Sequence, residues 1–138
     1  MGIGDRLKWR GIRPTDPEEI FTYREPPEGC TYLTRTLVAV GANVTIYTVP
    51  ANYIFYLTDY IFSLRATGVG NGNMRVNNGA GTDQFRLADS GAPGNWGLIT
   101  SHSFATAVTM VAEWYISLYS SAAAITCYGS IAGYTRAV

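Results

Sequence analysis

From residue 31 onward, apolar and polar residues alternate with a period of two, the period of a strand that buries one face. The expected strands are 32–40, 44–49, 53–65, 74–76, 84–87, 98–104, 108–118 with a candidate break near Glu113, and 125–134. About eight strands, at a spacing of roughly ten residues, predict an all-β sandwich or barrel.

Clusters of glycine, asparagine and proline separate these segments and predict turns. The clusters lie at 41–43, 50–52, 68–73 and 77–81. A long loop is expected from Ala88 to Gly97, with Trp96 near its end. The alanines at 122–124 are flanked by serine and β-branched residues, so a turn is expected there rather than a helix.

Residues 1–30 are expected to form an extended arm ahead of a domain spanning 31–138. Four prolines, at 14, 17, 26 and 27, forbid a continuous helix. Basic residues alternate with Leu7 and Trp9, so an extended arm would be charged on one face and apolar on the other. That pattern suits addition to the sheet edge of a partner, and a solvated tail is the alternative. The candidate partner-binding residues are Arg6, Leu7, Lys8, Trp9, Arg10 and Arg13.

Charge is scarce and unevenly distributed. Charged residues make up 14% of the chain, where about 25% is usual. Of the ten basic and ten acidic residues, twelve lie within residues 1–36. The remaining surface is therefore poorly protected against association, which suits a domain covered by copies of itself or by a partner. A monomer whose surface relies on hydroxyls and amides is the alternative.

The net charge and the hydropathy pattern exclude two classes of partner. The formal net charge is zero, which gives no electrostatic argument for binding nucleic acid. No stretch approaches the roughly 18 to 20 apolar residues that a membrane span requires. The first 13 residues are basic but lack the apolar core of a secretory leader.

The residues that carry chemistry are few and dispersed. His102 is the single histidine, and no serine lies in a nucleophile-elbow context. Cys30 and Cys127 either pair or remain inert thiols. The carboxylates of the domain are Asp59, Asp83, Asp89 and Glu113, without a spacing that favours a catalytic pair. We therefore expect no enzyme, no metal and no cofactor, although asparagine oxygens within 71–83 offer a calcium alternative.

Two positions stand out as candidate contacts. Asp59 lies inside the most apolar strand and needs hydrogen-bond partners or a cation such as Arg65 or Arg136. Trp96, in its expected loop, is a candidate for stacking on a sugar ring or anchoring a protein interface. Packing of Trp96 back over the core is the alternative.

Three motifs resemble small jelly-roll proteins encoded by tailed bacteriophages. They are Val49-Pro50-Ala51, the strand holding Leu57-Thr58-Asp59, and the closing Gly129-Ser130-Ile131-Ala132-Gly133-Tyr134. The resemblance covers roughly residues 44–136, and Asn52 stands where glycine or a similar turn residue is usual.

The resemblance implies a jelly roll that forms a homotrimer on the virion exterior after synthesis in the host cytoplasm. The protein would then be a capsid decoration, or cementing, protein bound to the major capsid protein. A carbohydrate- or receptor-binding module of a fibre or adsorption protein, using Trp96 and the Gly/Asn loops, is the alternative. A sugar-active enzyme using the domain carboxylates is a third.

Overall fold

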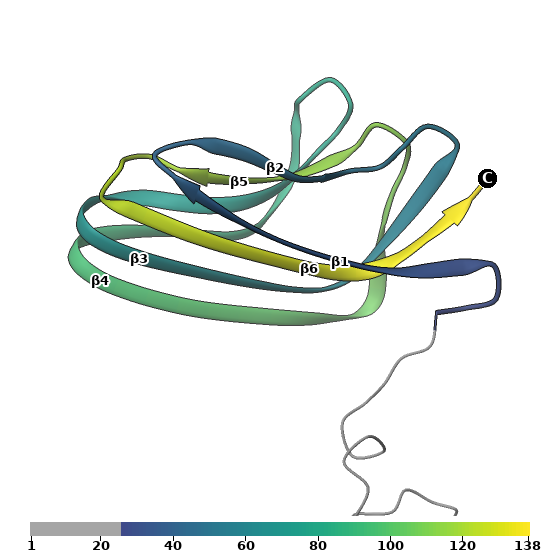
Figure 1. The fold of residues 1–138 in the computed structure, drawn as a ribbon, viewed down its shortest axis with the longest axis horizontal. Coiled ribbons are helices and arrows are strands. Elements are labelled where there is room, and N and C mark those ends of the chain that lie inside the picture. The colour runs from purple at the N-terminus through teal and green to yellow at the C-terminus, as the bar shows by residue number, and fades with distance from the viewer. Residues whose placement is uncertain (1–25) are drawn as a thin grey trace, which may run out of the picture.

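The computed structural model describes residues 26–138, so the predictions made for residues 1–25 lie outside it. The described chain is all β, as expected (Figure 1). Its six strands are β1 (Cys30–Val40), β2 (Asn43–Thr48), β3 (Tyr53–Asn77), β4 (Asp83–Met110), β5 (Tyr115–Ser120) and β6 (Ile125–Ala137).

The two longest strands contribute to both layers of a sandwich. Residues 53–66 of β3 pair with β6, and residues 72–77 pair with β5. β4 follows β3 along both parts. The first sheet therefore has the order β1-β6-β3-β4 and the second has the order β2-β5-β3-β4. In Figure 1, β3 and β4 turn back together from one layer into the other.

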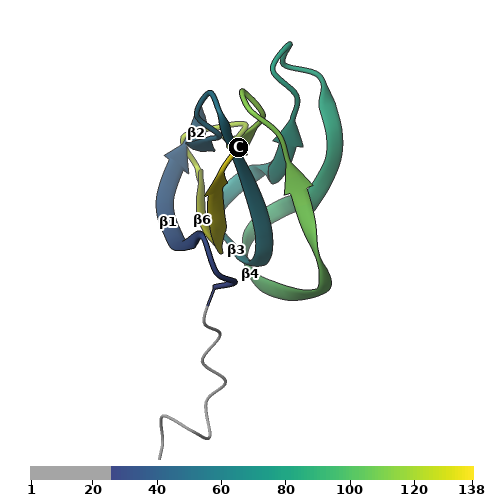
Figure 2. The ribbon, with the colours of Figure 1, turned by 90° about the vertical axis from the view of Figure 1, so that its right-hand side faces the viewer.

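This connectivity is that of a jelly roll, in which two four-stranded antiparallel sheets enclose one core. Of the eight strands expected from the sequence, 53–65 and 74–76 are joined within β3, and 84–87 and 98–104 are joined within β4. The expected strand 108–118 is divided at the break near Glu113, because residues 108–110 continue β4 and the part after the break belongs to β5. β1 and β4 form the two opposite edges of the first sheet (Figure 2).

The segment expected as a turn at 68–73 is instead the bend at which β3 leaves one sheet for the other. The Thr67 N–H donates to the carbonyl of Ala124 at 2.9 Å, and the Ser121 N–H donates to the carbonyl of Asn71 at 2.9 Å. A Cβ on Gly72 would lie 2.2 Å from the Cys127 sulfur. Glycine is therefore required here by close packing of two strands, and not by a turn.

The loop expected between Ala88 and Gly97 is also wrong, because these residues continue β4. Their ladder partners are the glycine-rich residues of the β3 bend, so the two segments bend together. Pro93 is tolerated because β4 is an edge strand and one of its two sides needs no donor. Trp96 is consequently a strand residue, opposite Ala66.

The other turns agree with the sequence. The Asn78 side chain accepts hydrogen bonds from the N–H groups of Ala80 and Thr82, both at 2.9 Å, which closes the turn between β3 and β4. Glu113, at φ 72°, lies in the break between β4 and β5 that was predicted near this residue. Residues 122–124 form the expected turn.

The core lies between the two sheets and is built from alternate residues of facing strands. Its fully buried side chains include Phe55, Phe62, Leu57, Leu64, Met74, Met110, Ile116, Leu118, Ile125, Val49, Val76 and Cys127. Both cysteines are free thiols. Cys30 pairs with Arg136 and Cys127 pairs with Ala39, so nine positions of β6 separate them along the β1–β6 ladder. The structure thus has the two separate thiols that were one of the two alternatives.

Candidate interaction surface

The first sheet presents one side to solvent, which we call its outer face. The register places one residue of each strand in every cross-strand row, for example Val38, Tyr128, Ser63 and Ile99. Side chains of one row share a face because alternate residues of a strand point to opposite sides. The outer face comprises Tyr32, Thr34, Thr36, Val38 and Val40 of β1, Thr126, Tyr128, Ser130 and Ala132 of β6, Asp59, Ile61, Ser63 and Arg65 of β3, and Gly97, Ile99, Ser101 and Ser103 of β4.

The outer face is rich in apolar and hydroxyl side chains and poor in charge. Ile99 is 77% exposed and Ile61 is 50% exposed. Val38, Val40 and Tyr128 are also exposed, and the face has only two charged side chains among its residues defined above. Several exposed apolar side chains on one face of a sheet mark a candidate surface for binding another protein.

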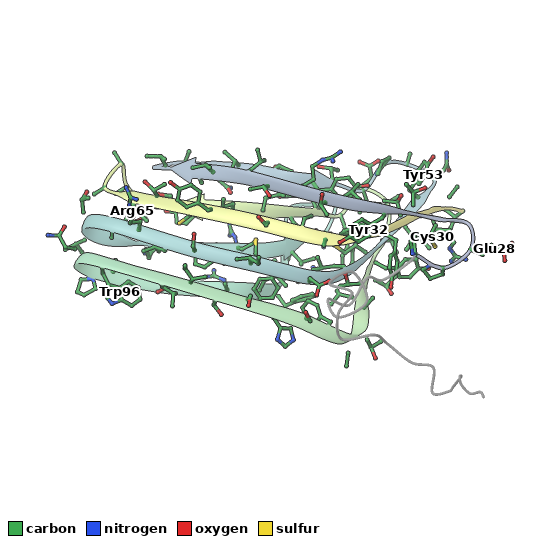
Figure 3. The ribbon with its side chains drawn as sticks, turned by 60° about the horizontal axis from the view of Figure 1, so that its bottom comes forward. Glu28, Cys30, Tyr32, Tyr53, Arg65 and Trp96 are labelled. Carbon is green, nitrogen blue, oxygen red and sulfur yellow. The ribbon has the colours of Figure 1, made fainter. Side chains whose placement is uncertain are left out.

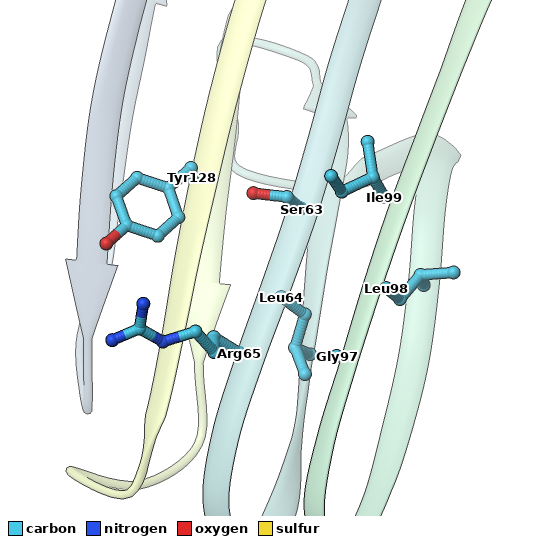
Figure 4. Close-up of a pocket in the computed structure, with 7 residues that line it drawn as sticks. All are labelled: Ser63, Leu64, Arg65, Gly97, Leu98, Ile99 and Tyr128. Carbon is cyan, nitrogen blue, oxygen red and sulfur yellow. The ribbon is translucent and has the colours of Figure 1, made fainter.

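A shallow depression of about 460 Å³ opens on this face. It is lined by Ser63, Leu64, Arg65, Gly97, Leu98, Ile99 and Tyr128. Arg65 and Tyr128 lie on one side of it, and Ile99 lies across β3 from them (Figure 4). Within residues 26–138, the Arg65 guanidinium makes no hydrogen bond or ion pair, and it therefore offers an accessible cation beside apolar surface.

The other charge of the face, Asp59, is anchored by hydroxyls. The Thr58 hydroxyl donates to Asp59 Oδ2 at 2.6 Å, and the Ser103 hydroxyl donates to Asp59 Oδ1. Arg136, which was one of the two expected cations, instead donates to the Tyr56 hydroxyl at 2.8 Å. The Asp59 carboxylate thus joins β3 to β4 through Ser103, and the two hydroxyls are hydrogen-bond partners of the kind that its place in the strand was expected to need.

The outer side of the second sheet is different, because its charges are paired with one another. Arg75 Nη1 lies 3.3 Å from Asp83 Oδ1, and Arg86 Nη1 lies 2.7 Å from Asp89 Oδ2. Arg86 Nη2 also lies 3.5 Å from Asp83 Oδ2. The two sides of the sandwich are therefore chemically distinct.

The residues predicted as sites are only partly within the described chain. All six arm residues, Arg6, Leu7, Lys8, Trp9, Arg10 and Arg13, lie outside it. Trp96 lies in β4, 40% exposed, at the end of the sheet that also carries Arg65 and away from Cys30 (Figure 3). It shares the core side of the sheet with its partner Ala66, and it does not line the depression.

No catalytic arrangement forms around the titratable residues that the structure describes. The His102 ring packs against Phe104, with centroids 4.7 Å apart, and lies 6.1 Å from the Tyr60 ring. Burial raises the pKa of the Cys127 thiol to about 11, so this thiol is protonated at neutral pH. Within residues 26–138, no three His, Cys, Asp or Glu side chains gather to hold a metal ion, and no helix is long and apolar enough to cross a membrane.

Sequence reasoning did not place Ile61, Arg65, Ile99 and Tyr128 together on one surface, and it named Arg65 only as a possible partner of Asp59. The alternation of Asp59, Ile61, Ser63 and Arg65 was visible in the sequence. However, the β-bulge at Thr58 moves these odd positions to the outer side, after Phe55 and Leu57 have pointed inward. A pattern of apolar residues on both faces of β3 was the only available signal.

Comparisons with known proteins do not identify a family for this chain. No protein-family model matches the chain, and no curated protein matches it. Among solved structures, the Tobacco streak virus coat protein in a C2 crystal form is similar, with a TM-score of 0.39 and 12% identity over 83% of this chain and 91% of that chain. The structure of the Tobacco streak virus coat protein dimer gives a TM-score of 0.39 and 11% identity over the same shares. The jelly-roll assignment rests on the strand pairing of this chain.

Proposed function

We propose that this protein is a structural virion protein, a capsid decoration or cementing protein that binds the major capsid protein on the outer shell as a homotrimer. It would be made in the host cytoplasm, and it would carry out no catalysis. The observation that supports the proposal most strongly is the outer face of the first sheet. That face carries apolar and hydroxyl side chains with only two charges, whereas charged side chains on the outer side of the second sheet pair with one another.

A decoration protein stabilises a shell by binding its assembled form, and it needs buried surface rather than chemistry. The outer face supplies apolar surface, and Ile61, Ile99 and Val38 would gain most from being covered. The arm supplies most of the charge in the sequence, which suits the selection of orientation and register on a partner. In this proposal, contacts between copies use the domain and contacts to the shell include arm residues such as Arg6 and Trp9.

The proposal is tested with the full chain and with shells of its parent particle assembled without it. We expect the protein to cosediment with the shells to a saturating ratio and to raise the temperature at which they disassemble. A variant with Arg6, Lys8 and Arg10 all replaced by alanine should bind more weakly and with a smaller dependence on salt. Absence of saturable binding to these shells would contradict the proposal.

The carbohydrate-binding alternative has no comparable support. Its candidate residue, Trp96, belongs to a strand, and the Gly/Asn segment at 68–73 belongs to β3 rather than to a binding loop. Trp96→Ala in the full chain would decide the matter, because loss of glycan binding with retained folding would favour the alternative.

A further inference from the structure

Both edges of the first sheet are open in the described chain. β1 pairs with β6 on one side, and β4 pairs with β3 on one side. Edge strands are normally protected from association by charges, by short length or by a covering segment. Residues 90–110 of β4 contain no Asp, Glu, Lys or Arg at all. This long edge therefore lacks the charged residues that would keep another strand away.

Two hydrogen bonds show which backbone groups of β4 face the open edge. The Thr67 N–H and the Asn71 carbonyl both bond to residues on the side of β3 away from β4. Their ladder partners on β4, Asn95 and Gly91, therefore belong to pairs that exchange no hydrogen bonds across β3–β4. Odd-numbered residues of this part of β4 thus direct their N–H and C=O groups to the open edge.

The position of Pro93 agrees with this alternation, because a proline has no N–H to give to a ladder. The β3–β4 register continues without a shift from Asp89 to Ser103. The same alternation therefore holds for Gly97, Ile99 and Ser101. Their backbone donors and acceptors face the open edge, and their side chains lie on the outer face.

The open edge of β1 is arranged in the corresponding way. In the first sheet, the backbone N–H and C=O groups of odd-numbered β3 residues point toward β6. Their hydrogen-bonded partners on β6 are even-numbered, as in the pair Arg65 and Thr126. The backbone groups of odd-numbered β6 residues therefore point toward β1, as in the pair Cys127 and Ala39. The residues of β1 whose backbone groups face the open edge are Thr34, Thr36, Val38 and Val40, and their side chains also lie on the outer face.

We infer that the β4 edge of one copy pairs, antiparallel, with the β1 edge of a second copy and so joins their first sheets. The directions permit this, because successive strands in the order β1-β6-β3-β4 are antiparallel and β1 therefore runs opposite to β4. The faces also match, since the outward backbone groups of both edges belong to residues with side chains on the outer face. Arg35 is the one charged residue of β1, and β4 presents no like charge to it from Gly91 to Met110.

We assign β1 of a second copy, rather than its β4, as the partner of the β4 edge because only this pairing lets the copies form a closed ring. Pairing two β4 edges about a two-fold axis would leave both β1 edges open. Head-to-tail pairing of β4 with β1 uses both edges of each copy and leaves none open when the ring closes. The inference rests on the homotrimer proposed above for the number of copies in the ring.

Two proline variants of the full chain form a matched test. Ser101→Pro removes an N–H that faces the open edge, so the monomer should keep its fold and its unfolding midpoint while the trimer is lost. Thr100→Pro removes an N–H that faces β3, where Thr100 pairs with Phe62. It should destabilise the monomer itself. Circular dichroism, urea unfolding and native mass spectrometry report these results.

Amide hydrogen exchange on the unmodified protein tests the pairing without any variant. The amides of Ile99 and Ser101 on β4, and of Thr36 and Val38 on β1, should exchange slowly in the trimer and rapidly after dilution to monomer. A trimer in which these amides exchange rapidly, or a Ser101→Pro protein that stays trimeric, would overturn the edge pairing and leave the trimer standing. A monomeric wild-type protein would instead overturn the proposed trimer, and the pairing with it.

Discussion

Replacement of Ile99 by threonine tests whether the outer face of the first sheet is buried on assembly. Ile99 is 77% exposed in the single chain and lies beside the depression on this face. Threonine keeps the β-branched shape that suits a strand, so the substitution leaves the fold of the monomer intact. It replaces apolar surface with a hydroxyl at a position that a partner would cover.

The expected magnitude follows from the exposed fraction. Full burial of an isoleucine side chain stabilises by about 1.5–3 kcal/mol. Because 77% of the residue is still exposed, association can recover roughly three-quarters of that, or about 1–2 kcal/mol for each copy. This corresponds to an association constant that is about 5- to 30-fold lower for each contact between copies.

Sedimentation equilibrium of the wild-type and variant chains measures this weakening, and urea unfolding of the monomer checks the fold. Val69→Thr is the matched control, because Val69 is 75% exposed but lies at the bend and not on the outer face. Equal weakening by both variants, or no weakening by Ile99→Thr, would refute the assignment of the outer face as the assembly surface.

Three further predictions concern stability and thiol chemistry. Gly72→Ala should destabilise the monomer by about 1–3 kcal/mol in urea unfolding, because the new Cβ would lie 2.2 Å from the Cys127 sulfur. Gly97→Ala should change little, because its new Cβ would lie 3.6 Å from the Leu64 carbonyl oxygen, an ordinary contact. Equal effects would contradict this account of the bend. Ser120→Ala should lower the free energy of unfolding of the monomer by about 1–3 kcal/mol. The buried Ser120 hydroxyl accepts from the Gly41 N–H at 2.8 Å and donates to the Ile125 carbonyl at 2.6 Å. An unchanged midpoint of urea unfolding would argue against these bonds. Cys127, with its pKa raised to about 11 by burial, should react with a thiol reagent at pH 8 far more slowly than Cys30 until urea is added. Its contribution to stability should be complete below the unfolded pKa of about 9 and be lost as the pH rises toward 11, and fast labelling of both native thiols would contradict its burial.

The strands were largely predictable from the sequence, because alternation of apolar and polar residues is a local signal. The long run 53–65 became the first part of β3, and the break near Glu113 and the turn at 122–124 also agree with the structure. The turn built on Asn78 was visible because its side chain closes the turn through neighbouring backbone groups.

The two bent segments were not predictable, because glycine has more than one structural use. At 68–73 and 88–97, glycine and proline normally indicate a turn or loop. Here the same residues let two strands bend together while Gly70 and Gly72 admit close contact with β6 and the 121–125 turn. The distinction depends on contacts with residues about 50 positions away, such as that of Gly72 with Cys127, which local sequence does not record.

The scarcity of charge on the domain was predicted from the sequence, but its distribution over the two sides of the sandwich was not. The scarcity of charge after residue 36 correctly indicated a domain with little charged surface, but the structure divides that surface into two unlike sides. The β-bulge at Thr58 decides which residues of β3 face outward. Trp96 was chosen as a contact because it was assigned to a loop, and the structure places it in a strand instead.

The native mass of the full chain at micromolar concentration tests the central claim most directly. The account predicts three copies of the 15.0 kDa chain, about 45 kDa, with reversible dissociation on dilution. A mass of one chain at every concentration would contradict the claim that the outer face and the open edges of the first sheet are surfaces for assembly.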